Sequence, residues 1–462
     1  MVTKRIFTLL LLIITGYAIV SLSSGCAQIG APTGGDRDSA APVLLRAEPE
    51  NLSTNFTGNK ITLSFDEYID VQDVQQNVLI SPLQKNNPSV NFNFRTVTIR
   101  FRDTLLPNTT YSIQFGNALK DLNEGNPLKD FVYIFSTGEV LDSLSFSGKI
   151  IMAETGKTDS TLVAMLYRNA ADSTVLNMRP LYIARVSGSG DFTFNNLPPG
   201  NYKTYALKDG DGGKTYNSKT EAFAFLDSNT IISQNTPPVT LYAYEEIKSK
   251  TEIKTQLKTK PEKRLRYTST LNAQSQDILK PLELTFNNSI NTLDSGLVLT
   301  DTNYRPVKNA FYIFDSTRKK LEIKTTWQPD LNYTLIIPKT SILDSAGNSL
   351  LRSDTIRFKT KKSEDYGTVL FRFKNLDLSM KPVLQFIQNG EIKFSSAVTA
   401  KEWSDKMFLP GDYEIRILFD TNNNRMWDPG NYMQKLQPEK VITLPQTLSI
   451  RANWDNERDI TL

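Results

Sequence analysis

The feature that most constrains this chain is an internal duplication that involves two different units. Residues 61–70 (ITLSFDEYID) match residues 282–291 (LELTFNNSIN) at an offset of 221. Residues 197–209 (LPPGNYKTYALKD) match residues 408–420 (FLPGDYEIRILFD) at an offset of 211. Repetition at a fixed spacing is the signature of duplicated structural units. We therefore interpret the chain as four modules in the order A1, B1, A2 and B2.

The duplication and the composition of the connecting segments predict the boundaries of these modules. Residues 27–42 carry Gly, Pro, Ser and Asp without apolar periodicity, which predicts a flexible tether. Residues 245–266 are dense in Lys and Glu, which favours a solvated linker or an edge strand over a basic surface for anionic lipid. We assign a signal peptide to 1–25, the tether to 26–42, A1 to 43–138, B1 to 144–244, the charged linker to 245–264, A2 to 265–362 and B2 to 366–462.

Apolar and polar side chains alternate along the segments that we expect to be strands. Ile61, Leu63 and Phe65 fall on one face of such a segment, and Thr62 and Ser64 fall on the other. This period of two predicts half-buried strands, and clusters of Asn, Pro and Gly separate them as turns. About seven short strands in roughly 95 residues suit a two-sheet sandwich. The sequence predicts an all-β protein of tandem antiparallel β-sandwiches.

Two family resemblances follow from these motifs. Module A resembles the bacterial Ig-like domains of S-layer and cell-surface proteins (the SbsA or Big type), through its x-I-x-L-x-F-[DN] strand and its P-x-x-x-Y entry to a later strand. Module B resembles the carboxypeptidase-regulatory or Cna-B-like sandwich, which has a transthyretin-like fold, through its L-P-x-G-x-Y step. Tyr111 and Tyr333 are candidates for the tyrosine corner of Ig-type sandwiches, with core packing as the alternative. These motifs are signatures of a fold that many activities share.

The N-terminus is typical of an exported protein. Lys4 and Arg5 precede an apolar run, and small residues lead to Cys26, the only cysteine of the chain. A retained anchor helix is the alternative interpretation. The segment LSSGC, residues 22–26, resembles a bacterial lipobox, although Ser23 stands where Leu is commonest. The resemblance implies cleavage before Cys26, acylation of Cys26 with chains such as palmitate, and anchoring by several chains. Since Ala27 follows in place of an aspartate, it also implies sorting to the outer membrane.

Composition excludes several classes of function. The chain has no histidine, which removes the usual general base, the Ser-His-Asp arrangement and the commonest zinc ligand. Its 53 basic and 49 acidic residues are spread along the sequence, so that no nucleic-acid partner is expected. With Cys26 acylated, no disulfide remains. No constellation of catalytic residues stands out, and the sequence predicts a protein that is not an enzyme.

One loop of B2 carries the pattern of a metal site. Counted from Asp420, oxygen-bearing side chains fall at the first, third, fifth and ninth positions, which are Asp420, Asn422, Asn424 and Asp428. Hard oxygen donors at alternate positions suit calcium, the candidate cofactor. Arg425 at the sixth position and Asn431 at the twelfth exclude an EF-hand, in which Gly and Glu stand there. The alternative is an Asx-rich turn whose side chains cap their own backbone.

The corresponding loop of B1 serves as a comparison. At the offset of 211, the four candidate ligands are replaced by Asp209, Asp211, Gly213 and Asn217, whereas the cation and the aromatic residue persist as Lys214 and Tyr216. That pattern favours the turn, with the aromatic residue packed on the end of the sandwich.

With its lipobox, the whole chain resembles an Ig-like domain lipoprotein of the Bacteroidetes type. This resemblance implies a membrane-anchored extracytoplasmic lipoprotein, and we expect its tandem sandwiches to act in adhesion or as a scaffold. Its expected partners are the membrane, through the N-terminal lipid, and an envelope protein or glycan. The alternative function is a carbohydrate-binding or envelope polymer-assembly accessory protein. Trp427 is the candidate ligand-binding residue for it, together with Trp403 and Trp454, and packing in a core or an interface is the other role open to each tryptophan.

Overall fold

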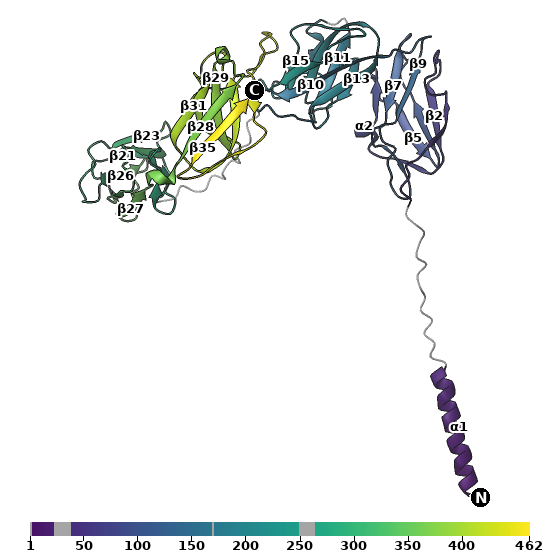
Figure 1. Ribbon diagram of the computed structural model, residues 1–462, viewed down its shortest axis with the longest axis horizontal. Helices are drawn as coiled ribbons and strands as arrows, with labels where there is room; N and C mark the ends of the chain where they lie inside the picture. The colour runs from purple at the N-terminus through teal and green to yellow at the C-terminus, as the bar shows by residue number, and fades with distance from the viewer. Residues whose placement is uncertain (1, 23–37, 169–170, 249–263) are drawn as a thin grey trace. The chain divides into compact units, whose positions relative to one another are not determined.

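The computed structural model describes residues 2–22, 38–168, 171–248 and 264–462. Apart from α1 (Val2–Leu22) and a few short helical turns, the regular elements in these ranges are strands (Figure 1). The all-β prediction is therefore confirmed. Contacts divide the chain into two compact units, 1–141 and 142–462. Within the described ranges, no helix has the length and apolar character that crossing a membrane requires.

Module A1 belongs to the first unit and consists of two sheets and a strand pair. The first sheet has the order β1-β2-β6-β5, with β1 at Leu44–Glu48, β2 at Lys60–Phe65, β6 at Thr96–Arg100 and β5 at Ser89–Asn93. The second has the order β4-β7-β9, at Leu79–Ser81, Thr110–Gln114 and Val132–Ser136. The pair is β3 (Ile69–Val71) with β8 (Leu119–Asp121), and α2 spans Val74–Asn77.

The core of A1 lies where the alternation places it. Ile61, Leu63 and Phe65 of β2 are fully buried and share one apolar cluster with Tyr111 of β7 and Phe135 of β9. The inward-facing rows of two sheets thus form a single core, as in a sandwich.

In the second unit, module B1 pairs a three-stranded sheet with a five-stranded one. The smaller sheet has the order β13-β10-β17, at Asp191–Leu197, Leu144–Met152 and Val239–Ala243. The larger has the order β12-β11-β14-β15, at Tyr182–Arg185, Val163–Arg168, Gly200–Leu207 and Phe223–Phe225, with β16 (Thr230–Ile232) also on β14. The short helix α3 spans Thr174–Asn177.

Module B2 has the same pattern of sheets. Its smaller sheet is β31-β28-β35, at Glu402–Phe408, Gly367–Lys374 and Asp455–Thr461. Its larger sheet is β30-β29-β32-β33, at Glu391–Ala397, Pro382–Gln388, Gly411–Phe419 and Val441–Thr443, with β34 (Leu448–Ile450) on β32. Two 3₁₀ turns, η1 and η2, lie at Ser363–Asp365 and Leu378–Met380.

Module A2 has three sheets. Two are four-stranded: β18-β20-β24-β23, at Tyr267–Ser269, Leu282–Phe286, Lys320–Lys324 and Phe311–Phe314, and β19-β27-β25-β22, at Ser275–Gln276, Asp354–Thr360, Asn332–Ile337 and Val298–Thr300. The third is the pair β21 (Ile290–Leu293) and β26 (Ile342–Asp344).

The sequence predicts antiparallel sheets, but three strand pairs differ from this expectation. The strand pairs β10–β17, β28–β35 and β19–β27 are parallel. Parallel neighbours cannot be joined by a tight hairpin and need a crossover connection. In B1 and B2 the parallel partners are the first and last strands of the module, so that the rest of the sandwich supplies the crossover.

Four tyrosines tie the motif turns to the strands that follow them. The hydroxyls of Tyr111 and Tyr333 accept the backbone N–H of the residue five positions earlier, at 2.7 and 3.3 Å. The hydroxyls of Tyr202 and Tyr413 donate to the carbonyl of the residue four positions earlier, at 3.0 and 3.1 Å. All four residues are buried. Tyr111 and Tyr333 therefore combine both roles that the sequence left open, since they fill the core and also form a tyrosine corner.

Candidate functional site

The Asp420–Asp428 loop follows β32 and is closed by hydrogen bonds among its own residues. The carboxylate of Asp420 is fully buried and accepts the backbone N–H groups of Asn424 and Arg425, at 3.1 and 2.7 Å. The side-chain amides of Asn422 and Asn424 both donate to Oδ2 of Asp428, at 2.6 and 2.7 Å. The structure thus brings together all four residues that the spacing singled out.

A fifth oxygen-bearing residue joins the loop from outside the motif. Glu439, just before β33, is buried, and its Oε1 accepts the backbone N–H and the hydroxyl of Thr421 at 2.7 and 2.9 Å. Its Oε2 accepts the N–H of Asp428 at 3.1 Å. Sequence spacing could not reveal Glu439, because only the return of the chain to β33 places it there.

These contacts bear on the calcium hypothesis. In the described ranges, no group of three or more His, Cys, Asp or Glu side chains is placed to hold a metal ion. The amide nitrogens of Asn422 and Asn424 face Asp428, so both amides must turn before their oxygens can face a cation. These contacts favour the Asx-rich turn, and calcium binding by this loop remains the alternative hypothesis.

The matching loop of B1 has the same backbone anchor. Asp209 accepts the backbone N–H of Lys214 at 2.9 Å, as Asp420 accepts that of Arg425, and both basic residues have a positive φ (57° and 63°). Asp211 accepts the N–H of Gly213 and the amide of Asn217, at 2.8 and 2.9 Å. An aspartate that closes a turn onto the backbone N–H five residues later is therefore common to both copies.

Beyond Asp428 the chain of B2 forms a short hairpin whose tip lies in B1. Asn431 and Leu436 exchange two backbone hydrogen bonds, at 2.8 and 2.9 Å. Between them, Tyr432 is only 2% exposed, and its ring lies edge-on to Phe223 and Phe225 of B1, with centroids 5.1 and 5.2 Å away. Tyr432, four residues beyond the metal-like loop, thus packs into a different sandwich.

Polar contacts hold Tyr432 in this position. Its hydroxyl donates to the carbonyl of Asp172 at 2.6 Å and lies 2.9 Å from the hydroxyl of Tyr205. Because the proton of Tyr432 is used by Asp172, Tyr205 is the donor in the second hydrogen bond. Burial, and then the hydrogen bond with Tyr432, raises the pKa of Tyr205 far above its ordinary value. Nζ of Lys435 lies 4.0 Å from the centroid of the Tyr432 ring and 3.1 Å from the Asp172 carboxylate.

A second contact joins B1 to β33 of B2. The backbone N–H of Val441 donates to the carbonyl of Ala153 at 3.1 Å. Gly156 has φ +64°, and a Cβ added there would lie 2.6 Å from the Val441 carbonyl oxygen. On the outer side of β32, Leu418 is fully buried with Val383 and Val441. Trp427 of the same module packs against these three side chains, so this part of the outer side of β32 is covered within B2.

The tryptophans named as candidates have different surroundings. Trp427 packs on the cluster of Leu418, and its indole N–H donates to the carbonyl of Glu439 at 2.8 Å. Trp403 lies among the aromatic rings of the B2 core and donates to Ser396 at 3.0 Å. Trp454 is mostly exposed. Ligand binding by Trp427 remains a prediction.

Two segments singled out from the sequence fall wholly or partly outside the described residues. Cys26 lies there, as does the charged linker from 249 to 263. The first linker residues, in contrast, belong to the folded body. Glu246 has a buried side chain that accepts the Tyr216 hydroxyl at 2.9 Å and pairs with Lys219 at 3.0 Å. The composition of the segment could not reveal this partner, which approaches from the loop after β14.

Comparison with known proteins identifies one segment. Residues 38–137 match the family model of the bacterial Ig-like domain. The Ig-like domain starts five residues before the predicted boundary of A1. This extension agrees with the structure, in which the carbonyl of Asp38 accepts the amide of Asn126 at 3.1 Å. No curated protein matches the chain.

Several solved structures are similar to parts of the chain at low identity. The TIE protein of Bacillus anthracis is 10% identical, with 93% of this chain and 76% of that chain covered and a TM-score of 0.17. The N-terminal part of the bacterial S-layer protein SbsC is 14% identical, with coverage of 42% and 44% and a TM-score of 0.16. BcpA, the major pilin subunit of Bacillus cereus, is 10% identical, with coverage of 69% and 99% and a TM-score of 0.16. Likenesses this weak carry no argument about function.

Proposed function

We propose that this chain is a membrane-anchored extracytoplasmic lipoprotein that acts as a non-enzymatic binding or scaffold protein. Its lipid anchor would be attached at Cys26, and its location would be the outer membrane. The L-S-S-G-C segment supports the anchor, and the Ig-like domain supports a structural or binding role for the folded part of the chain. The second repeated unit, of carboxypeptidase-regulatory type, would supply further sandwiches of the same kind.

The observation that carries the proposal is the insertion of Tyr432 of B2 into the aromatic cluster of B1. A sandwich that is flexibly linked to its neighbours and moves independently of them does not need an aromatic side chain buried in the next domain. Here the anchor is supported by hydrogen bonds, the ion pair of Lys435 with Asp172 and that of Lys157 with Glu414 at 2.6 Å. Packing of this type fixes the loops of two modules relative to one another, which suits a scaffold that presents a surface.

The anchor is tested by fractionating cells that express the full chain or its Cys26→Ser variant. We expect the unaltered chain in the outer-membrane fraction, with an acylated N-terminal peptide by mass spectrometry, and the variant in the soluble fraction. A Ser39→Ala variant, altered at an exposed position near the start of the Ig-like domain, serves as the control and should fractionate like the unaltered chain. Unchanged fractionation of Cys26→Ser would refute the lipid anchor.

The binding role is tested by cross-linking in intact cells, followed by purification of the full chain. A partner that is captured in the unaltered cells and lost with Cys26→Ser would support a scaffold that works at the membrane. Turnover of a substrate by the purified chain, in contrast, would refute the non-enzymatic assignment.

A further inference from the structure

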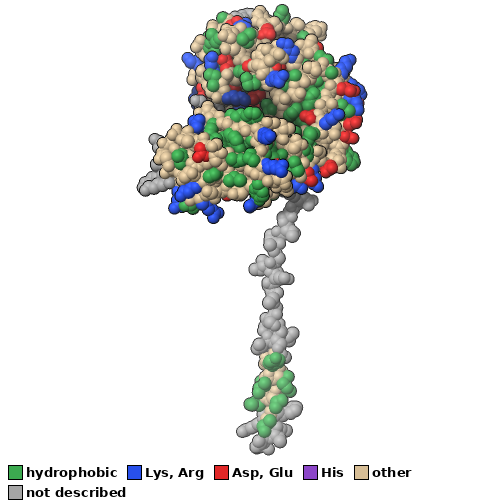
Figure 2. Space-filling view, turned by 90° about the vertical axis from the view of Figure 1, so that its left-hand side faces the viewer, with side chains coloured by type: hydrophobic (Ala, Val, Ile, Leu, Met, Phe, Trp, Pro, Cys, Tyr) green, Lys and Arg blue, Asp and Glu red, His purple; other side chains and the backbone are tan. Residues whose placement is uncertain are grey.

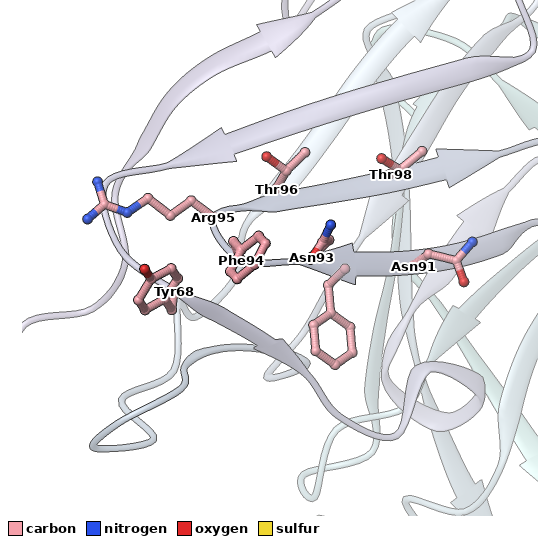
Figure 3. Close-up of a pocket in the computed structure, with 8 residues that line it drawn as sticks. Tyr68, Asn91, Asn93, Phe94, Arg95, Thr96 and Thr98 are labelled. Carbon is pink, nitrogen blue, oxygen red and sulfur yellow. The ribbon is translucent and has the colours of Figure 1, made fainter.

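On the outer face of the first A1 sheet, strands β5, β6 and β2 carry uncharged hydroxyl and amide groups in two rows, which end on β1 at Glu48 and Arg46, an ion pair. In one row Asn91 of β5 lies opposite Thr98 of β6, which lies opposite Thr62 of β2. In the other, Asn93 lies opposite Thr96, which lies opposite Ser64. Figure 3 shows the four residues of β5 and β6 beside the hairpin that joins these strands. Together with Tyr68, Phe92, Phe94 and Arg95, they line an open groove.

These groups are not used by the protein itself. Within the described part of the chain, none of the six side chains makes a hydrogen bond to another residue. Each Asn offers two donors and an acceptor, and each hydroxyl offers a donor and an acceptor. The face therefore presents many closely spaced, uncharged hydrogen-bonding groups to whatever lies over it.

Two exposed aromatic rings stand at the end of this face. Phe94 is 71% exposed and Tyr68 is 44% exposed, with their centroids 5.9 Å apart. The Arg95 guanidinium lies 5.5 Å from the centre of the Tyr68 ring. Phe94 has φ 52°, in a two-residue hairpin turn where Asn or Gly is favoured. A phenylalanine at this position costs conformational energy and leaves an apolar ring in water, which indicates a role other than folding.

Module A2 shows that the fold does not require such a face. At the matching positions of its sheet β18-β20-β24-β23, charged residues replace the threonines, and they satisfy one another. Lys320 pairs with Glu283 at 2.8 Å, and Lys324 pairs with Glu322 at 2.9 Å. Phe311 on the edge strand β23 is exposed in A2 but has this charged face beside it. The uncharged positions of β5, β6 and β2 are thus a property of the A1 sequence rather than of the sandwich.

We propose that this face of A1 binds a neutral polysaccharide with β-linked sugars of the gluco configuration. Equatorial hydroxyls of such a chain can exchange hydrogen bonds with the Asn and Thr rows, and the C–H faces of its rings can lie on Tyr68 and Phe94. Arg95 is the only charged residue among those that line the groove, which does not suit a highly charged polymer. The inference rests on the proposed binding role and names its ligand class.

The test is calorimetric titration of the full chain in detergent with cellohexaose and chitohexaose. We expect binding of at least one of them. Phe94→Asn and Tyr68→Ala should each weaken it roughly fivefold, the factor that corresponds to the contribution of about 1 kcal/mol from one aromatic contact. Asn suits the positive φ at position 94, so the first variant should fold normally. Thr98→Val, which removes one hydroxyl without changing shape, should weaken binding severalfold. The control Phe311→Ala should leave it unchanged.

The remaining outcomes would overturn the proposal. Binding of neither hexasaccharide, or equal binding by the Phe94→Asn and Tyr68→Ala variants, would refute a saccharide site here. Binding of an extended peptide along β5 that survives Phe94→Asn would identify strand addition as the use of this edge. If the saccharide fails while the cross-linked partner of the membrane-bound chain is found, the scaffold function stands without this ligand. If the saccharide binds but Cys26 is unmodified, the site stands and the anchor is wrong.

Discussion

The docking of B2 on B1 predicts that replacing Tyr432 with alanine separates two sandwiches that each keep their own core. The hydrophobic core clusters of B1 and B2 are formed by other residues and do not include Tyr432. Its removal leaves the Tyr205 hydroxyl and the Asp172 carbonyl without their partner. The cost should therefore appear as opening of the contact rather than as unfolding of either module.

The structure gives a magnitude for this cost. Truncating a fully buried aromatic side chain to alanine costs about 3–5 kcal/mol. Tyr432→Phe keeps the ring contacts and loses only the hydroxyl, so it should cost about 1–3 kcal/mol, the penalty for buried polar groups left unpaired. Met433→Ala is the matched control, since Met433 is the next residue in the same hairpin and is 67% exposed. It should change stability by no more than about 0.5 kcal/mol.

Hydrogen exchange on the full chain measures the effect where it arises. In Tyr432→Ala, the amide of Val441, which donates to Ala153 across the contact, should exchange roughly a hundredfold faster or more, the factor that corresponds to about 3 kcal/mol. Amides in the A1 core should keep their rates. Exchange of the Val441 amide in Tyr432→Ala that equals its exchange in Met433→Ala would refute the claim that Tyr432 holds the two sandwiches together.

Three further predictions follow from individual contacts. Gly156→Ala should destabilise the contact of B1 with β33 by well over the ~1 kcal/mol that a positive φ costs an alanine, because the added Cβ would meet the Val441 carbonyl. Gly125 also has a positive φ but has open space around it, so Gly125→Ala should show only that cost in urea unfolding. Burial opposes ionisation of Asp344, yet hydrogen bonds from the Asn348 side chain and backbone hold the pKa of Asp344 below its usual range. The stability that this carboxylate contributes should therefore be complete above about pH 4, the ordinary Asp range, and should be lost as the pH falls through the folded-state pKa. Urea midpoints of the full chain should drop in that window and drop less in Asp344→Asn. Since the side chains of the Asp420 loop already satisfy one another, calcium and chelator should give the same Tm, and a calcium-dependent rise that Asp428→Ala abolishes would establish the metal site instead.

Surface charge is one property that the composition indicates and the structure displays. Lys and Arg side chains lie scattered among acidic and uncharged ones on the face seen in Figure 2. This agrees with the near-balance of 53 basic and 49 acidic residues. The composition gives no positions, however, and it could not show that charged residues of A2 pair with one another at positions where A1 has threonines.

The strands and the core of each module could be predicted because they depend on local order. Ile61, Leu63 and Phe65 are buried, as their alternation with polar residues predicted, because successive side chains of a strand point to opposite faces. The same holds for Tyr413, Ile415 and Ile417 of B2. The anchoring of Asp209 and Asp420 in matching turns also follows from local sequence, since an aspartate can close a turn onto nearby backbone N–H groups.

By itself, then, the sequence determined the β-rich class, the paired repeats and the identity of the turn residues, all of which follow from neighbours within a few positions. Only the tertiary structure decided that Tyr432 lies in B1, that Glu439 completes the Asp420 loop, and that Tyr68 and Phe94 border a row of unused hydroxyl and amide groups. These contacts join residues far apart along the chain or on separate modules. The physical reason is that periodicity reports which face of a strand is apolar, whereas packing between sheets and modules decides what that face meets.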